Sequence, residues 1–325
     1  IFQEFNELYP DLNPLLVDAN LTGEMRLNES NVLIGTTALL FRDLGSELDL
    51  VIFDESQKMA VEQQNKLTGK NTHKISVSAT PIPRTMALAT YGAVTIEKIT
   101  KCHADKQIYT RVIHSNWNQL VDEILWSIYD AGKQAVIVCA RKDDDGNTLS
   151  DAKSEVISVE DTYNYFSKIM PNLVVTSHSG LTTEQNTTAL NAMRSGKAKL
   201  LVATTVVEVG VTLPDVNYLA VLNPERFGLS QMHQLRGRVA RRGGEGWFTM
   251  YLSKELSNQK TIQRLNILVE TTDGFRVAEK DMELRGIGDV LKATSQHGKY
   301  VGLIRNAEID LNTVETIIGN LSEPP

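Results

Sequence analysis

The chain has 325 residues, of which 42% are hydrophobic and 22% are charged, and its formal net charge is −7. This composition excludes a disordered chain and argues against a wholly basic nucleic-acid coat protein, although a local basic groove would still allow DNA binding. The length suits about two domains of roughly 150 residues each.

The cellular setting can be predicted from three features. No apolar run approaches the ~20 residues that span a bilayer. The chain begins with Ile1, and no basic-then-apolar leader follows. Cys102 and Cys139 are isolated thiols, which favour a reducing compartment over a disulfide framework. We therefore predict a cytoplasmic protein, of a bacterial or phage-type setting, without a membrane association.

From Asn31 to about Tyr251 the chain alternates short apolar runs with helix-like segments. Such alternation predicts parallel strands joined by crossover helices, which is an α/β fold. The expected strands are Val32–Gly35, Leu50–Phe53, Lys74–Ser78, Gln134–Cys139, Leu173–His178, Lys199–Thr204, Tyr218–Leu222 and Trp247–Leu252.

Two helices are well marked. One has an apolar stripe over residues 120–128, follows Asn116 and closes at Gly132. The other begins at Thr182, and Gln185 three residues later completes a capping-box pattern.

A polar stretch near Lys101–Arg111 predicts a domain boundary. We expect a first domain over residues 1–110 and a second over residues 111–255. After about Ser253 the pattern becomes mainly helical, which predicts an extension over residues 256–325.

Asp54 and Glu55 end an apolar strand. Ligands bind at this end of the strands in open α/β sheets. Asp54 is placed to hold Mg²⁺ on nucleotide phosphates through water, and Glu55 could act as general base toward the attacking water. The alternative is an ordinary surface acid pair after a strand.

The next expected strand ends in Ser78-Ala79-Thr80. Hydroxyl groups there could bond the carboxylates and sense the phosphate state. The alternative is a proline-stiffened loop before a helix that starts near Arg84.

A third pattern is Gln234-x-x-Gly237-Arg238-x-x-Arg241. We expect a helix to place Arg238 and Arg241 on one face, because they stand three residues apart. Two guanidinium groups suit a γ-phosphate, as arginine fingers do in phosphoryl transfer. The alternative is an ordinary basic helix.

Together with Ala203-Thr204-Thr205, these motifs resemble those of superfamily 2 helicases. The runs "ATPIPRT" at 79–85, "ATTVVEVGV" at 203–211 and "ERFGLSQMHQLRGRVAR" at 225–241 are similar to the RecG family and to its relative Mfd. Gly35–Leu39 resembles motif Ib, "SHSG" at 177–180 the family's "HG" turn, and residues 273–298 the shared translocation motif.

The resemblance implies two tandem RecA-like parallel-sheet domains, the first one incomplete, that clamp ATP and Mg²⁺ between them. It implies the following roles. Asp54, Glu55, Gln57, Gln234, Arg238 and Arg241 would be catalytic, with Gly210 at the nucleotide; Thr36, Thr37, His178, Gly180, Thr204 and Thr205 would contact DNA; Ser78, Thr80, Arg285 and Gln296 would couple hydrolysis to translocation.

The main departure from the family is an absence. No Gly-x-x-x-x-Gly-Lys-Ser/Thr loop occurs in the 325 residues, so the phosphate cradle of the motor is missing from them. We expect that loop to lie upstream of Ile1 in a longer protein. Gln57, Thr212 and Ala240 replace the family's usual histidine, acidic residue and glycine.

The function expected is that of a monomeric, ATP-dependent translocase on double-stranded DNA, which acts on branched or forked DNA by fork reversal and branch migration. Two alternatives stay open: an ATPase-deficient RecG-like module that binds DNA or a partner, and an Mfd-like transcription-repair translocase. The retained acidic and arginine motifs favour an active motor, and the missing loop motivates the first alternative.

Overall fold

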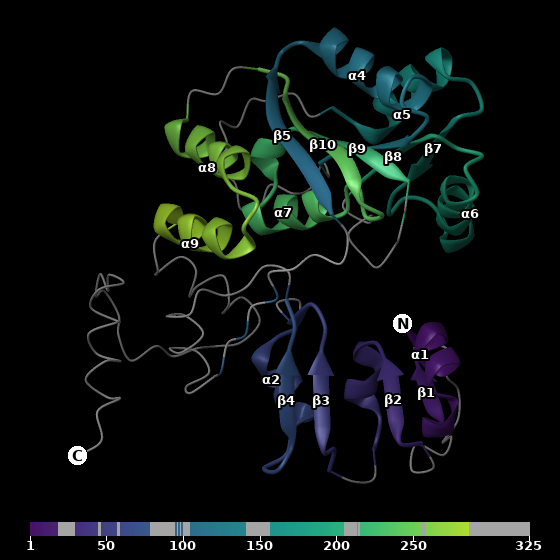
Figure 1. The fold of residues 1–325 in the computed structure, drawn as a ribbon, viewed down its shortest axis with the longest axis vertical. Coiled ribbons are helices and arrows are strands. Elements are labelled where there is room, and N and C mark those ends of the chain that lie inside the picture. The colour runs from purple at the N-terminus through teal and green to yellow at the C-terminus, as the bar shows by residue number, and fades with distance from the viewer. Residues whose placement is uncertain are drawn as a thin grey trace. The chain divides into compact units, whose positions relative to one another are not determined.

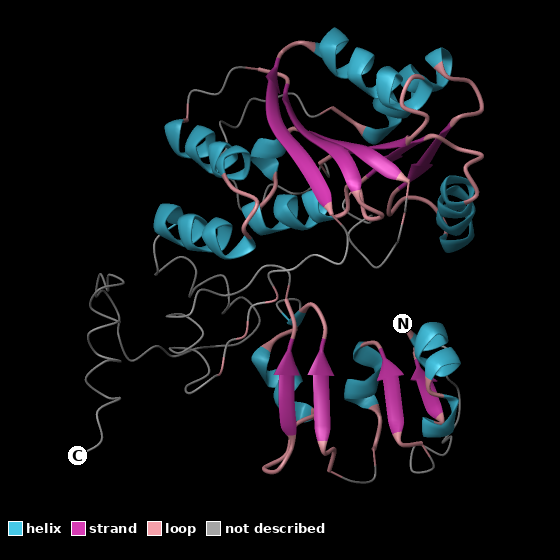
Figure 2. Cartoon of the chain, viewed as in Figure 1, coloured by secondary structure: helices cyan, strands magenta, loops and turns pink. Residues whose placement is uncertain are grey.

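A computed structural model describes residues 1–18, 30–44, 47–56, 59–78, 95, 97, 99, 105–140, 157–204, 213, 215–254 and 258–285. The chain divides into two compact units, and their described parts lie in residues 1–78 and 95–285. Each unit is a parallel α/β structure (Figure 1, Figure 2). The described residues contain no helix that is long and apolar enough to cross a membrane.

Unit 1 contains two separate parallel strand pairs. β1 (Pro14–Val17) pairs with β2 (Val32–Gly35), and β3 (Leu50–Phe53) pairs with β4 (His73–Ser76). Short helical segments lie around them: α1 (Phe2–Leu8), η1 (Pro10–Leu12), η3 (Thr37–Phe41) and α2 (Val61–Lys66). The expected strands at β2 and β3 are confirmed, whereas β1 was not expected from the sequence.

Unit 2 is built on a six-stranded sheet in which every neighbouring pair is parallel. The spatial order is β5-β10-β9-β6-β8-β7. The strands are β5 (Lys106–His114), β6 (Gln134–Val138), β7 (Val174–Ser177), β8 (Leu200–Ala203), β9 (Val216–Leu222) and β10 (Gly244–Leu252).

Helices cover both faces of this sheet (Figure 1). α4 (Trp117–Tyr129) and α5 (Val159–Ile169) pack on one face, around Leu120, Ile124 and Phe166. The other face is covered by α6 (Thr183–Arg194), α7 (Leu229–Gly237), α8 (Gln259–Glu270) and α9 (Gly274–Arg285). The strands are therefore buried on both sides, as parallel sheets require.

The two helices expected from the sequence are confirmed as α4 and α6. The Asn116 side chain caps α4 by accepting a hydrogen bond from the Gln119 N–H. The capping box of α6 forms between Thr182 and Gln185, with distances of 3.2 Å and 2.9 Å for its two hydrogen bonds. Each cap satisfies amide groups that a helix N-terminus leaves without partners.

The edge strand β5 is the main feature that the sequence did not predict. The expected boundary between residues 110 and 111 falls inside this strand, and all nine residues of β5 pair with β10. The boundary therefore lies before Lys106. The polar residues of this stretch mislead a hydrophobicity argument, because an edge strand has one side that is open to solvent.

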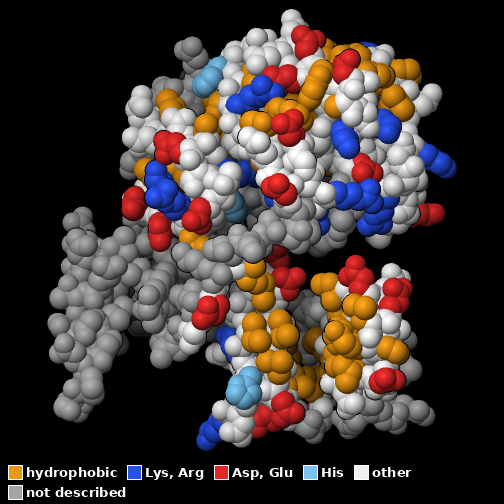
Figure 3. Space-filling view, viewed as in Figure 1, with side chains coloured by type: hydrophobic (Ala, Val, Ile, Leu, Met, Phe, Trp, Pro, Cys, Tyr) orange, Lys and Arg blue, Asp and Glu red, His pale blue; other side chains and the backbone are white. Residues whose placement is uncertain are grey.

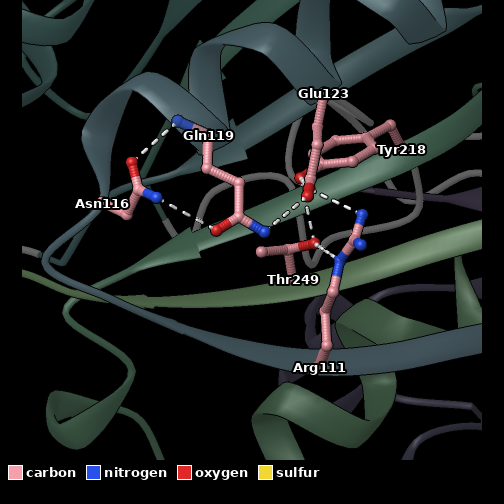
Figure 4. Close-up of polar contacts among 6 residues, drawn as sticks. All are labelled: Arg111, Asn116, Gln119, Glu123, Tyr218 and Thr249. Atoms are coloured by element: carbon pink, nitrogen blue, oxygen red, sulfur yellow. Dashed lines mark hydrogen bonds and ion pairs between the residues drawn. The ribbon is translucent and has the colours of Figure 1, made fainter.

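Polar contacts hold β5 to the rest of unit 2 (Figure 4). The Arg111 guanidinium lies 2.6 Å from the Glu123 carboxylate of α4, and the Tyr218 hydroxyl of β9 donates to the same carboxylate over 2.6 Å. Thr249 of β10 lies 3.0 Å from the Tyr218 hydroxyl. Burial, together with the bond to Glu123, raises the pKa of Tyr218. The network replaces water around groups that would be costly to bury alone.

Candidate nucleotide and DNA-binding sites

The acidic pair lies directly after β3, as expected. The side chain of Asp54 is exposed, and Glu55 is half-buried. The Glu55 N–H donates to Asp54 Oδ1 over 2.9 Å. Since β3 and β4 are parallel with Phe53 opposite Ser76, Ser78 follows its strand at the same edge of the pair. The structure thus brings these three predicted residues to one strand end.

The turn that carries the acidic pair has an uncommon backbone. Glu55 has a φ of 51°, in the left-handed region that non-glycine residues seldom adopt. Such a conformation costs on the order of 1 kcal/mol and persists where the surroundings enforce it. Here Ser56 N–H bonds to the Val77 carbonyl of the β4 side, over 3.1 Å. The backbone therefore holds Glu55 in one orientation after the strand.

Gln64 of α2 contacts two backbone groups shortly after the acidic pair, and the sequence did not point to it. Its side chain is 2% exposed and donates to the carbonyl oxygens of Ser56 and Met59, each over 3.1 Å. A buried glutamine that donates to backbone carbonyl groups cannot be recognised from the residue types around it in a single sequence.

The acidic site fits the chemistry of a nucleotide-bound magnesium ion. An exposed aspartate at the end of a strand offers a hard oxygen ligand of the kind that Mg²⁺ prefers. Among the described residues no group of three or more His, Cys, Asp or Glu side chains could hold a metal. Mg²⁺ in nucleotide sites draws most of its ligands from phosphate and water, so a single carboxylate is compatible with this role.

The two threonines of the motif-Ib segment follow β2. Thr36 caps the short helix η3, because its hydroxyl accepts a hydrogen bond from Ala38 N–H over 3.3 Å. Both Thr36 and Thr37 are exposed. Gly35 before them is required by space, since a Cβ there would lie 2.4 Å from the Val17 carbonyl oxygen. The turn therefore presents the side chains of two threonines to solvent.

In unit 2, the predicted DNA-contacting residues gather at the carboxyl ends of two adjacent strands. His178 and Gly180 follow β7, and Thr204 follows β8. Thr204 N–H donates to the Ser177 carbonyl over 3.3 Å, which ties the two ends together. The Thr204 hydroxyl is buried and has no hydrogen-bond partner among the described residues. The structure therefore brings together three residues that lie up to 26 positions apart in the sequence.

The expectation that one helix carries both Arg238 and Arg241 is wrong. α7 ends at Gly237, and Arg238 is its C-cap residue. Ala240 then has a φ of 51°, which takes the chain out of the helical path before Arg241. Gln234 alone of the three lies within the helix, and Arg241 is in the turn that leads to β10. Spacing by three residues predicts a shared face only while the helix continues.

A buried arginine joins α7 to α8. Arg236 is 2% exposed, and its guanidinium donates to the Leu268 carbonyl over 2.5 Å. A second guanidinium nitrogen lies 2.9 Å from His233 Nδ1. Burial, followed by the Arg236 charge, lowers the pKa of His233 to about 4, so its neutral ring can accept this bond. A cation near the end of α8 also suits the negative end of the helix dipole.

Several predicted residues lie outside the described part of the chain. These are Gln57, Thr80, Thr205, Gly210 and Gln296, together with the side chain of Arg285 at the end of α9. Their roles stay predictions.

The sheet of unit 2 and the motifs at its edges define a class of protein. Residues 115–243 match the family described as helicase conserved C-terminal domain. The chain also has the fold of S. cerevisiae Dbp5 bound to RNA and ADP BeF3, with a TM-score of 0.57, 17% identity, and coverage of 91% of this chain and 77% of that one. The fold is thus a RecA-like helicase fold of parallel sheets and helices.

Within this class, the chain is RecG-like. It is 35% identical over 286 residues to the ATP-dependent DNA helicase RecG of Treponema pallidum, which covers 85% of this chain and 40% of that protein. Identity to RecG of Thermotoga maritima is 35% over 297 residues, with 90% and 37% covered. The structure of RecG bound to a three-way DNA junction matches with a TM-score of 0.68 and 28% identity, covering 98% of this chain and 41% of that one.

The chain spans about two fifths of the length of these relatives. The expected resemblance to superfamily 2 helicases of the RecG type is confirmed.

Proposed function

We propose that the protein to which this chain belongs is an ATP-dependent DNA helicase, a monomeric motor that translocates on double-stranded DNA and remodels branched or forked DNA in the cytoplasm. The observation that carries the proposal is the likeness to RecG over most of the chain, one relative being bound to a three-way DNA junction. Fork reversal and branch migration are the activities that we infer from it.

The residues after β3 would serve the nucleotide. ATP bound with Mg²⁺ supplies the phosphoryl group whose hydrolysis drives movement. Asp54 would hold the ion, and Glu55, kept in one backbone conformation after the strand, would accept a proton from water. Arg238 and Arg241 would place positive charge near the phosphates.

DNA would be bound through its backbone. In unit 1 the exposed Thr36 and Thr37 would contact the DNA through their hydroxyl groups. In unit 2 the contact would come from the half-buried His178 and the exposed Gly180, with Thr204 at the same strand end. Contacts of this kind position a protein on a duplex without reading its sequence. This suits a motor that must step along any DNA.

The carboxylate role can be tested in the full-length protein with Glu55→Gln. This change should abolish DNA-stimulated ATP hydrolysis and leave ATP binding intact, because it removes the base and keeps the shape. Glu62→Gln on the exposed side of α2 is the matched control and should retain turnover. Equal turnover in both variants would remove Glu55 as the base.

The arginine role can be tested in the same way. Arg241→Ala should lower turnover by roughly 10³–10⁵, the range seen for arginine fingers. The neighbouring Arg242 pairs with Asp215 over 3.0 Å on the surface, so Arg242→Ala is the control and should change turnover little. A full-length protein that binds DNA but shows no turnover in its wild-type form would instead be the ATPase-deficient module.

A further inference from the structure

The side-chain amide of Asn186, in the first turn of α6, contacts both ends of the turn that follows β7. Its Oδ1 accepts hydrogen bonds from the Ser177 hydroxyl over 2.7 Å and from His178 N–H over 3.1 Å. Its Nδ2 lies 3.2–3.3 Å from the carbonyl oxygens of His178, Leu181 and Thr182. One side chain thus satisfies backbone groups along the whole turn.

Only an amide of this length fits these partners. The His178 N–H must donate, so the atom facing it must be an acceptor, and the three carbonyl oxygens need a donor. This pattern fixes which way the amide points. Aspartate would place a second acceptor against the carbonyl oxygens, and leucine would remove both the acceptor of the His178 N–H and the donor to the Leu181 carbonyl.

Two further hydrogen bonds within the turn restrict its conformation. Gly180 N–H donates to His178 Nδ1 over 3.2 Å, and Leu181 N–H donates to the His178 carbonyl over 3.1 Å. A Cβ on Gly180 would lie 3.1 Å from the same His178 nitrogen. The His178 ring and the Gly180 backbone therefore hold one relative position, which depends on where Asn186 keeps the backbone of His178.

We propose that Asn186 is the positioning residue of the His178–Gly180 turn and that, through this turn, it sets the affinity of the protein for duplex DNA. The inference rests on the proposed function, in which the turn contacts the DNA backbone. Asn186 itself need not touch DNA, because its amide is occupied by the turn.

The test uses the full-length protein and a fluorescein-labelled 30-base-pair duplex, with the dissociation constant measured by anisotropy across a salt series. Asn186→Asp should raise the dissociation constant tenfold or more. Asn191→Asp adds the same charge to the exposed side of the same helix and should raise it less than threefold. Equal effects of the two variants would overturn the proposal, because charge alone would then account for the change.

The salt series provides a readout that overall stability does not move. The slope of log affinity against log salt follows the number of phosphates that Lys and Arg side chains neutralise, and residues 177–182 contain neither. Asn186→Asp should therefore weaken binding at every salt concentration and leave the slope equal to that of Asn191→Asp. Ser177→Ala removes one of the five contacts of Asn186 and should raise the dissociation constant by a smaller factor. This variant tests the proposal even if the Asn186→Asp protein folds poorly.

The proposal and the function on which it rests fail differently. If His178→Ala weakens DNA binding but Asn186→Asp matches its control, the turn binds DNA and Asn186 does not position it. If neither His178→Ala nor Thr204→Ala weakens binding, the assignment of this strand end to DNA is wrong, and the role of Asn186 falls with it. A double variant of His178→Ala and Asn186→Asp should bind no more weakly than the weaker single variant.

Discussion

The two units use the same kind of strand but differ in how it is covered. In unit 2 the middle strands β6, β8 and β9 are buried at every residue. In unit 1 the residues of β3 alternate between exposed and buried, and all four residues of β4 are exposed. Figure 3 shows apolar side chains on the surface of unit 1. The exposed large hydrophobic residues of this unit include Leu16, Leu50, Ile52, Ile75 and Val77.

This difference shows that a strand that forms locally is stabilised only when other elements cover it. Parallel sheets occur in proteins with both faces covered, because their strands are apolar on both sides. Unit 2 has six strands and helices on each face, all from within the described residues. Unit 1 has four-residue strands in two separate pairs. We therefore expect unit 2 to be the stable part of this chain.

The largest expected effect is on independent folding. Residues 105–285 alone should unfold in one cooperative transition, whereas residues 1–79 alone should show none, because two-stranded sheets are marginal in water. Circular dichroism during urea titration measures both. A cooperative transition in the shorter fragment would show that its apolar faces are covered by contacts within it.

A pair of matched substitutions sharpens the comparison residue by residue. Ile137 on β6 is 0% exposed and Ile52 on β3 is 60% exposed. Ile137→Ala should lower the free energy of unfolding by about 2–5 kcal/mol, since it removes buried methyl groups and leaves a cavity. Ile52→Ala in the same chain should cost less than about 1 kcal/mol.

The full-length protein offers a second outcome for this pair. If Ile52→Ala is as costly there as Ile137→Ala, then residues outside this chain cover β3, and the contrast between the units belongs to the 325 residues only. Urea denaturation of both proteins, followed by near-UV circular dichroism, distinguishes the two results.

Unit 2 should also lose stability at acid pH through His233. Its pKa is lowered to about 4 in the folded state, by burial first and by the Arg236 charge second, while Asp273 opposes the shift and Lys106 adds to it. Since unfolded histidine takes up its proton near pH 6.5, the neutral ring favours folding above that pH. This contribution, on the order of 3 kcal/mol, is lost as the pH falls from about 6.5 to about 4.

His233→Asn is the variant that checks this pH dependence, because an asparagine oxygen can accept the Arg236 bond without taking up a proton in this range. The stability of residues 105–285 measured between pH 7 and 4 should fall less steeply in the variant. An identical slope would assign the acid sensitivity to other groups.

The smallest expected effect is a gain in the stability of unit 2. Ala240 has a φ of 51° at a position where the RecG-type motif favours glycine. Relief of the left-handed strain should outweigh the greater chain entropy of glycine, so Ala240→Gly should stabilise residues 105–285 by up to about 1 kcal/mol. A rise in Tm of a few degrees would agree with this, and a fall would mean that the buried Ala240 methyl group contributes more by packing.

Much of the local structure was determined by the sequence alone. The capping residues Asn116 and Thr182, the stripe of α4 and the short apolar strands predicted their elements, because these signals depend only on neighbours along the chain. The acidic pair after β3 and the hydroxyl after β8 were predictable for a different reason, because ligands of parallel sheets bind at the carboxyl ends of the strands.

Only the tertiary structure decided the rest. Residues 106–111 of the polar stretch belong to the edge strand β5, because all of β5 pairs with β10. α7 ended at Gly237 before Arg241, where Ala240 N–H bonds to the Val216 carbonyl. Arg236 bonds to a backbone carbonyl that lies 32 residues away in the sequence. Asn186 bonds to backbone groups of the turn after β7. The spacing of residues predicts which side chains share a face of a helix or strand. It does not predict which backbone groups those side chains bond, because folding brings these groups close.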